Sequence, residues 1–254
     1  MDEHAQDTLR PTNEELQVLF TEALRESGDV TIDCVAESRA LWMRGVLPQA
    51  QQVRPGDNLR GGVAMRTLGD EVLIHPYVMR QVCTNGAVLS HARSTRIVSR
   101  QRFDPAVVSA HSFSLASVSA DVTAAVRNCA SPEAFSDGVN EMRASLEVDA
   151  DTVIENLQFA DVLSSLGRSL SAHSVFRVLA RIMRQASGAG GRERSAFALG
   201  NALTSAGRDA ASPAVRWTLE EYGAAVFAAS LSASAPPVAT LRGRAIGDAN
   251  TRTL

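Results

Sequence analysis

The sequence predicts an α+β protein with an N-terminal helix, a β-rich section and a helical C-terminal half. Apolar residues recur at helical spacing before residue 27 and again after residue 104, whereas between these points they form short runs broken by glycine and proline. The chain therefore divides into an acidic N-terminal helix at 1–27, a β-rich, arginine-rich section at 28–103, a helical region at 104–230, and a tail at 231–254 that we expect to be mobile.

The first helix is predicted over residues 11–26. Thr12 or Asn13 is suited to cap it, because both side chains accept hydrogen bonds from the first free backbone N–H groups. Two glutamates follow in the first turn, where the helix dipole favours acids, and Ser27-Gly28 ends the helix. Its apolar face comprises Leu16, Leu19, Phe20, Ala23 and Leu24.

The first part of the β-rich section reads as short strands separated by turn residues. In order, we predict strands at 30–35 and 41–47, a polar loop at 49–58, a strand at 59–68 and a turn at Gly69-Asp70. Pro48 ends the second strand, and Arg54-Pro55-Gly56-Asp57 has the composition of a turn. Gly61-Gly62 indicates a bulge or a close approach of two backbones.

The stretch Leu73–His91 combines apolar residues, turn residues and positive charge. It is predicted to run as strand, short helix, turn and strand. Pro76 would open the short helix, since its missing N–H is not needed there. Thr84-Asn85-Gly86 would stop it, because Asn and Gly tolerate the left-handed conformation. Residues 88–98 then continue as one bent strand or as a strand and a loop.

Six helices are predicted in the second half. The first five are opened by Asp104-Pro105, by Ser131-Pro132, at about Thr152, before Val175 and at Ser195. The last begins at Ser212-Pro213 and runs to about Ala229. A short strand at Phe113 to Leu115 is an alternative within the first of these. The helix after Val175 carries Leu179 and Ile182 on one face, with Arg177, Arg181 and Arg184 opposite.

One motif resembles a known family. The segment Arg80-Gln-Val-Cys83-Thr84-Asn85-Gly86 is similar to the signature of an uncharacterised family of phage/plasmid-like proteins, a domain of unknown function. Phe197–Ala206, Val215-Arg216-Trp217 and Glu220–Gly223 resemble its helical C-terminal part, whereas Asn58–Gly69 departs from it. The resemblance implies a phage, plasmid or prophage context and no particular chemistry.

The composition indicates a globular protein, with 45% hydrophobic and 21% charged residues. Three widely separated cysteines, Cys34, Cys83 and Cys129, favour neither a disulfide framework nor a zinc site. The acidic start is no signal peptide, and no window has the roughly 18 apolar residues of a membrane span. We therefore expect a cytoplasmic protein without a membrane partner.

Charge is distributed unevenly along the chain. Residues 1–37 hold ten acids and two arginines, whereas residues 38–103 hold ten arginines and three acids, and the chain contains no lysine. Between Glu71 and Asp104 there is no acid, but five arginines fall there: Arg80, Arg93, Arg96, Arg100 and Arg102. Such a cluster is a typical footprint for the phosphate backbone of nucleic acid. Alternatively, these arginines pair with the acidic N-terminal helix or across subunits.

The leading hypothesis is therefore non-catalytic binding of nucleic acid, single-stranded or non-specific. The alternative is a structural or protein-interaction module that self-assembles or binds a host or phage protein. A cysteine-dependent enzyme using Cys83 is third, because Cys83 lies near a predicted helix C-terminus, which does not lower a thiol pKa. Thr84, Asn85 and Gly86 are interpreted as structural with Cys83. We expect no catalytic residue, metal or cofactor, since no P-loop, metal spacing or nucleophile elbow is present.

Overall fold

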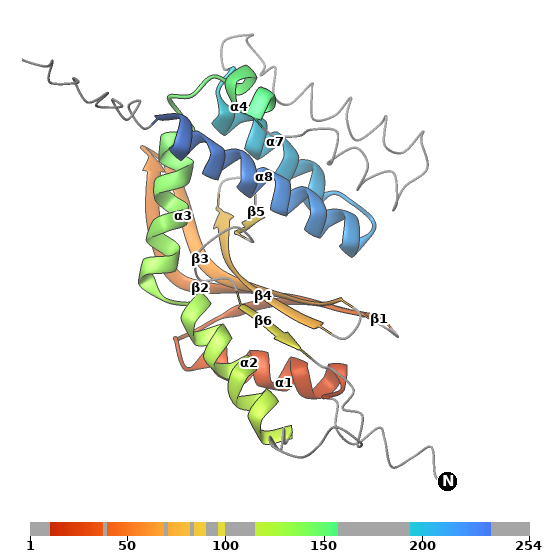
Figure 1. Cartoon of the computed structure of the whole chain (residues 1–254). Coiled ribbons are helices and arrows are strands. Elements are labelled where there is room, and N and C mark those ends of the chain that lie inside the picture. The colour runs from red at the N-terminus through yellow and green to blue at the C-terminus, as the bar shows by residue number, and fades with distance from the viewer. Residues whose placement is uncertain are drawn as a thin grey trace, which may run out of the picture.

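The computed structural model describes residues 11–37, 40–68, 71–81, 84–89, 96–99, 115–156 and 194–234. They form an antiparallel sheet with helices on both faces, so the predicted α+β class is confirmed (Figure 1). The strands are β1 (Thr31–Glu37), β2 (Ala40–Arg54), β3 (Asp57–Leu68), β4 (Glu71–Arg80), β5 (Asn85–Val88) and β6 (Arg96–Ser99). The helices are α1 (Asn13–Arg25), α2 (Leu115–Cys129), α3 (Pro132–Ala144), α4 (Ala150–Asn156), α7 (Ala196–Arg208) and α8 (Pro213–Ser234).

The order across the sheet is β1-β2-β3-β4-β5, and β6 also pairs with β4, on the same edge as β5. The N-terminal part of β4 pairs with β6 and its C-terminal part with β5. Residues 88–98 are thus not one bent strand: β5 ends at Val88 and β6 begins at Arg96.

The start of α1 follows the predicted capping chemistry. The Thr12 side chain accepts a hydrogen bond from the Glu15 backbone N–H, at 3.1 Å, and the Glu15 carboxylate accepts one from the Thr12 backbone N–H, at 2.7 Å. This reciprocal pair is a capping box, which satisfies two otherwise free N–H groups. The helix ends at Arg25, and Gly28 adopts a positive φ of 125° shortly after it.

The predictions for β2 and β3 are partly wrong. β2 continues through Pro48, and the predicted polar loop at 49–58 is mostly a hairpin whose turn lies at Pro55-Gly56. The β2–β3 register shifts between Val46 and Ala50, on either side of Pro48. Such a bulge interrupts the ladder of backbone hydrogen bonds, so the N–H that proline lacks is not required there. The close approach expected at Gly61-Gly62 is confirmed: a Cβ on Gly62 would collide with the carbonyl oxygen of Gly45.

The short helix predicted to open at Pro76 is also wrong. Pro76 lies inside β4, opposite Val63 of β3. On its other side, β6 pairs only with Glu71 to Ile74 and β5 only from Tyr77 onward. The carbonyl of Pro76 accepts a hydrogen bond from Leu89 N–H, and in a strand a residue's nitrogen points to the same side as its carbonyl. The proline nitrogen therefore faces the junction between β5 and β6, where no ladder bond is lost.

The helical half agrees in part with the sequence. Helices starting at Ser131-Pro132 and at Ser195 are confirmed, and both serines cap their helices by accepting a backbone N–H. α4 begins at Ala150, two residues earlier than expected, and α8 runs to Ser234, into the predicted mobile tail. The predicted helix start at Asp104-Pro105, the arginine face of the helix after Val175 and the tail beyond Ser234 lie outside the described residues.

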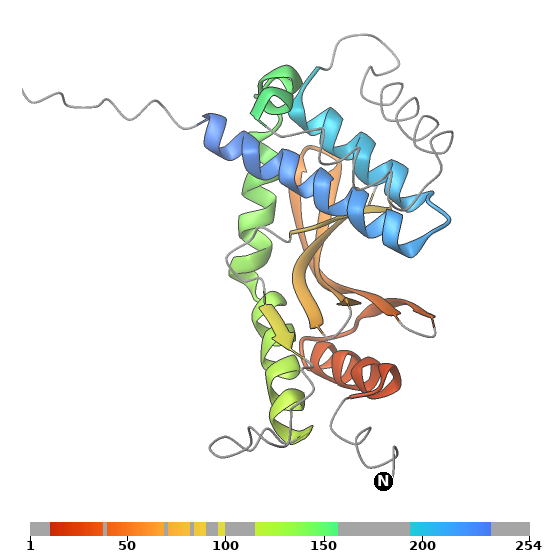
Figure 2. The same cartoon turned by 45° about the vertical axis from the view of Figure 1, so that its right-hand side comes forward.

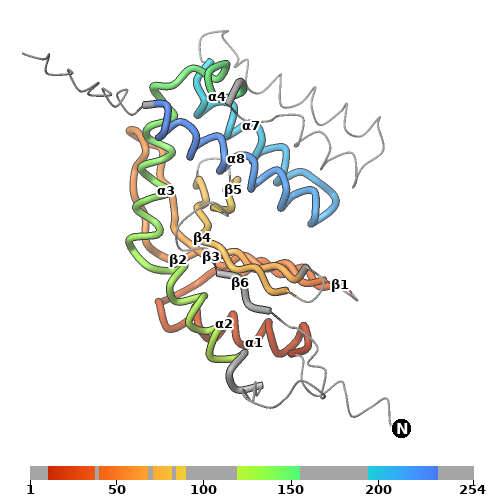
Figure 3. The backbone as a smooth tube through the Cα atoms, viewed as in Figure 1, coloured from red at the N-terminus to blue at the C-terminus, as the bar shows by residue number. Residues whose placement is uncertain are grey.

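The sheet separates two helical layers, as two views show (Figure 1, Figure 2). α1 and α2 cover one face, where Phe20 and Leu24 pack with Met43, Met65 and Ile74. α7 and α8 cover the other face, where Trp217 packs with Trp42, Ala64 and Tyr77. The β2–β3 hairpin bends towards α7 and α8, and α3 runs along it (Figure 3). None of the helices in the described part of the chain has both the length and the hydropathy of a membrane span.

Candidate functional site

The first predicted nucleic-acid contact, Arg80, is engaged inside the protein. Its Nε donates to both carboxylate oxygens of Asp57, at 2.7 and 2.8 Å, and its side chain is 16% exposed. The guanidinium also lies 5.3 Å from the centroid of the Phe197 ring. Arg96 opens β6 opposite Ile74, but its side chain is not described. Arg93, Arg100 and Arg102 lie outside the described residues.

The Cys-Thr-Asn-Gly motif brings β5 against α7. Cys83 lies outside the described residues, whereas Thr84, with a positive φ of 51°, makes the turn before β5. The expected left-handed positions at Asn85 and Gly86 are therefore wrong, since both belong to a strand. The buried Asn85 side chain donates from Nδ2 to Thr204 Oγ1 at 2.9 Å. Gly86 is required because a Cβ there would collide with the Tyr77 hydroxyl.

Arg80 and the α7 segment Phe197–Ala206 meet in the same interface. Arg80 Nη1 donates to the Asn201 side-chain oxygen at 3.4 Å, and Asn201 lies in the Phe197–Ala206 segment. Gly223 continues this packing on α8, because a Cβ there would collide with the Thr204 methyl group. Asn85 and Gly86 are thus held by hydrogen bonding to α7 and by close packing against Tyr77.

A buried charge network, which the sequence reasoning missed, joins α8 to the sheet. Arg44 of β2 donates from Nε to Glu220 Oε2 at 2.8 Å, and Arg216 donates from Nε to Glu220 Oε1 at 2.9 Å. The Arg44 and Glu220 side chains are only 3% and 0% exposed. Arg216 also reaches Asp33 of β1 at 2.8 Å. Burial raises the pKa of the Glu220 carboxyl, and the two guanidinium groups oppose this shift by stabilising the charged form.

Aromatic rings line the same interface. The Trp217 ring lies 4.9 Å from the Arg66 guanidinium carbon and 5.8 Å from that of Arg44, distances typical of cation–π contacts. His75 stacks at a tilt on Trp217, with 5.8 Å between centroids. Tyr77 is buried beside them, and burial raises the pKa of its hydroxyl. Register places Arg44, Ala64 and His75 side by side on β2, β3 and β4, beneath Trp217.

Hydrogen-bond donors in this interface are left over. Arg44 Nη2, Arg66 Nε and Trp217 Nε1 are buried and have no hydrogen-bond partner among the described residues. Buried donors without partners typically cost about 1–3 kcal/mol each. Arg66 is paired with Glu221 of α8 only loosely, at 3.7 Å, and both side chains remain about one-fifth exposed. The interface is therefore strongly charged, and its hydrogen bonding is incomplete.

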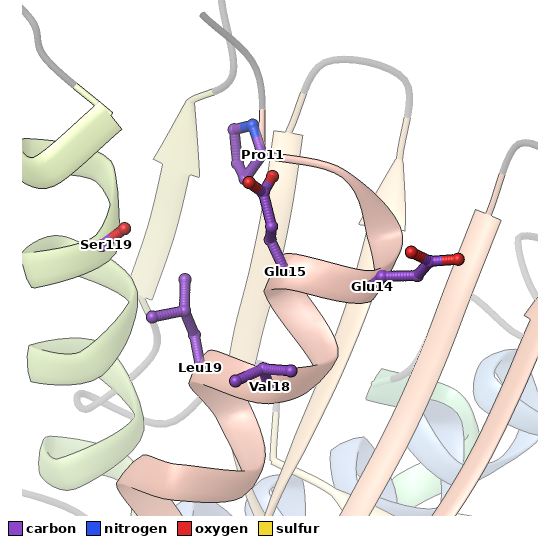
Figure 4. Close-up of a pocket in the computed structure, with 6 residues that line it drawn as sticks. All are labelled: Pro11, Glu14, Glu15, Val18, Leu19 and Ser119. Atoms are coloured by element: carbon purple, nitrogen blue, oxygen red, sulfur yellow. The ribbon is translucent and has the colours of Figure 1, made fainter. Parts of the chain in front are cut away.

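A separate hollow lies between α1 and α2 (Figure 4). It measures about 310 Å³, and its floor is apolar, with Val18 itself 53% exposed. Its lining residues are Pro11, Glu14, Glu15, Val18, Leu19 and Ser119. Glu14 and Glu15 are both exposed, and the Glu15 carboxylate accepts the Thr12 backbone N–H in the capping box.

Metal-binding clusters are absent from the part of the chain that the structure describes: no three His, Cys, Asp or Glu side chains converge there. No protein-family model, curated protein sequence or solved structure matches the chain. Two charged features distinguish the chain: the arginine segment around β6 and the interface between the sheet and α8.

Proposed function

We propose that the protein binds single-stranded nucleic acid non-catalytically through the arginines at 93–102. The main support is the charge of this segment, because the chain has no acid between Glu71 and Asp104. Within that stretch lie Arg93, Arg96, Arg100 and Arg102. Arginine suits this role because its planar guanidinium contacts phosphate oxygens bidentately. Arg80 is not among the proposed nucleic-acid contacts, because its guanidinium is already bound by Asp57.

The alternative, pairing of this segment with the acidic N-terminal part, is weakened by the partners of those acids. Glu26, the C-cap residue of α1, binds Arg127 of α2, with Arg127 Nε donating to Glu26 Oε2 at 2.7 Å. Asp33 of β1 binds Arg216 of α8. These two acids of residues 1–37 are therefore committed to arginines of the helical half. The resemblance to phage/plasmid-like proteins supports a mobile-element context, in which we expect a cytoplasmic protein.

The test is a fluorescence-anisotropy titration of a labelled oligothymidylate at several salt concentrations. Three or four phosphate contacts predict a log–log salt slope of about −2 to −3, from roughly 0.7 per contact on a single strand. Arg96→Gln/Arg100→Gln should reduce the steepness by about 1.4 and weaken all sequences alike.

The matched control is Arg25→Gln/Arg194→Gln, which removes the same charge from two exposed arginines elsewhere. It should leave the slope nearly unchanged. Arg80→Gln should lower the free energy of unfolding without changing the salt slope, because Arg80 pairs with the buried Asp57. If micromolar protein fails to bind at about 50 mM salt, where such contacts are strong, the proposal is wrong. If Arg96→Gln/Arg100→Gln instead lowers stability or disrupts assembly, these arginines serve internal or inter-subunit pairing.

A further inference from the structure

The sheet face beneath α8 combines arginines with aromatic rings. Arg44 contacts Trp217 from β2 and Arg66 contacts it from β3. Alternation along β3 places Arg60 on the same side as Arg66, and Arg60 Nε is buried without a hydrogen-bond partner among the described residues. Trp42 and Tyr77 pack in the same cluster. Guanidinium groups interleaved with aromatic rings are the features that proteins use to hold a single strand, with phosphates on the cations and bases on the rings.

Two neighbouring acids of α8 satisfy this face from above. Glu220 binds Arg44 at 2.8 Å, and Glu221 lies 3.7 Å from Arg66. Successive carboxylates on α8 thus take the positions at which successive phosphates would neutralise these arginines. The fit is imperfect, because Arg44 Nη2 and Arg66 Nε keep no partner among the described residues. An acceptor with more oxygen atoms, such as a phosphate, would satisfy more of these donors.

We propose that α8 is an autoinhibitory cover, whose Glu220 and Glu221 occupy arginines that bind single-stranded nucleic acid when α8 lifts away. This rests on the proposed function and extends it with a second contact surface. The outer pair is the accessible edge of the cover: Arg66 and Glu221 are 20% and 23% exposed, whereas Arg44 and Glu220 behind them are almost fully buried. An entering strand would displace Glu221 first. α7 and α8 lie on the same side of the sheet (Figure 1, Figure 3) and pack closely against each other at Gly200 and Gly223.

The experiment is a double-mutant cycle on the full chain, read out as oligothymidylate affinity and salt slope. Glu221→Gln frees Arg66 at a partly exposed pair, so affinity should rise about two- to fivefold, the range that such pairs contribute. The salt slope should steepen by about 0.7, the value for one added contact. Arg66→Gln in the Glu221→Gln background should reverse both effects. Glu147→Gln, which removes the same charge from an exposed position, should give neither.

Tryptophan emission supplies an independent readout of opening. The chain has two tryptophans, Trp42 and Trp217, and both are buried in this interface, 8% and 0% exposed. Saturating oligothymidylate should change their emission and their quenching by acrylamide, through exposure or through base stacking.

The outcomes separate the two proposals. Unchanged emission at saturation, or an effect of Glu221→Gln no larger than that of Glu147→Gln, overturns the cover while binding through Arg96 and Arg100 stands. Absence of binding in the wild type and in Glu221→Gln overturns both.

Discussion

Glu220→Gln is the sharpest test of the buried network, because each oxygen of the carboxylate serves a different arginine. Oε2 accepts from Arg44 and Oε1 from Arg216. A glutamine of the same shape keeps one oxygen and presents an NH₂ group to the other guanidinium, so one donor always faces another donor. With Glu220 fully buried, the mutant also leaves Arg44 as a buried cation without its counter-charge. Removing one partner of a buried pair costs about 3–5 kcal/mol of the free energy of unfolding.

Urea denaturation followed by tryptophan emission measures this loss. Arg44→Met should cost less than Glu220→Gln, because Glu220 then keeps Arg216 as its counter-ion. The control is Glu26→Gln, which breaks the Arg127–Glu26 pair, where both side chains are more than half exposed, and should leave the unfolding curve nearly unchanged. If Glu220→Gln unfolds at the same urea concentration as Glu26→Gln, the network does not hold α8 to the sheet and the reasoning fails.

Three further predictions follow from contacts around β5 and β1. Gly86→Ala should destabilise the fold by about 1–3 kcal/mol, as overpacking does, because the new methyl group meets the Tyr77 ring; an unchanged melting temperature would contradict this contact. Asn85→Asp should destabilise the fold by about 1–3 kcal/mol, at least as much as Asn85→Ala, because a carboxylate cannot donate to Thr204 Oγ1. Wild-type stability of Asn85→Asp would show that the amide donor of Asn85 is not needed. Burial, reinforced by the charge of Asp33, raises the pKa of the Cys34 thiol. Its alkylation, measured by mass spectrometry, should therefore be slower at pH 8 than that of free cysteine in solution and should accelerate as the pH rises. Equal rates at pH 8 would refute the shift.

Local capping chemistry was readable from the sequence. Thr12, Ser131 and Ser195 each begin a helix as expected, because the capping hydrogen bond joins residues only three positions apart. Pro76 was misread for the opposite reason. Its local preference for a helix start is real, but a strand tolerates it where the neighbouring strand changes from β6 to β5, and that junction depends on tertiary structure.

The candidate site was predictable only in part. Arg80 was singled out by charge, yet its partner Asp57 lies 23 residues away, on a strand that register brings alongside. Arg44 gave a weak signal, as a lone charge within an apolar strand, and Glu220-Glu221 beside Trp217 gave another. Nothing in the sequence linked them, because charge counting along the chain cannot pair residues that meet only after folding.

The pairing of Arg44 with Glu220 also sets an order of events during synthesis. The two residues are 176 positions apart, so at about 5–20 residues per second the arginine leaves the ribosome roughly 9–35 s before its counter-ion. During this interval β2, β3 and β4 can pair, but their charged face has to stay hydrated. A nascent chain halted before Pro213 would present an open sheet with Trp42 and Tyr77 uncovered, a surface that chaperones recognise and that aggregates readily. Completion of α8, rather than formation of the sheet, is thus the step that covers this face and protects the newly made protein from aggregation.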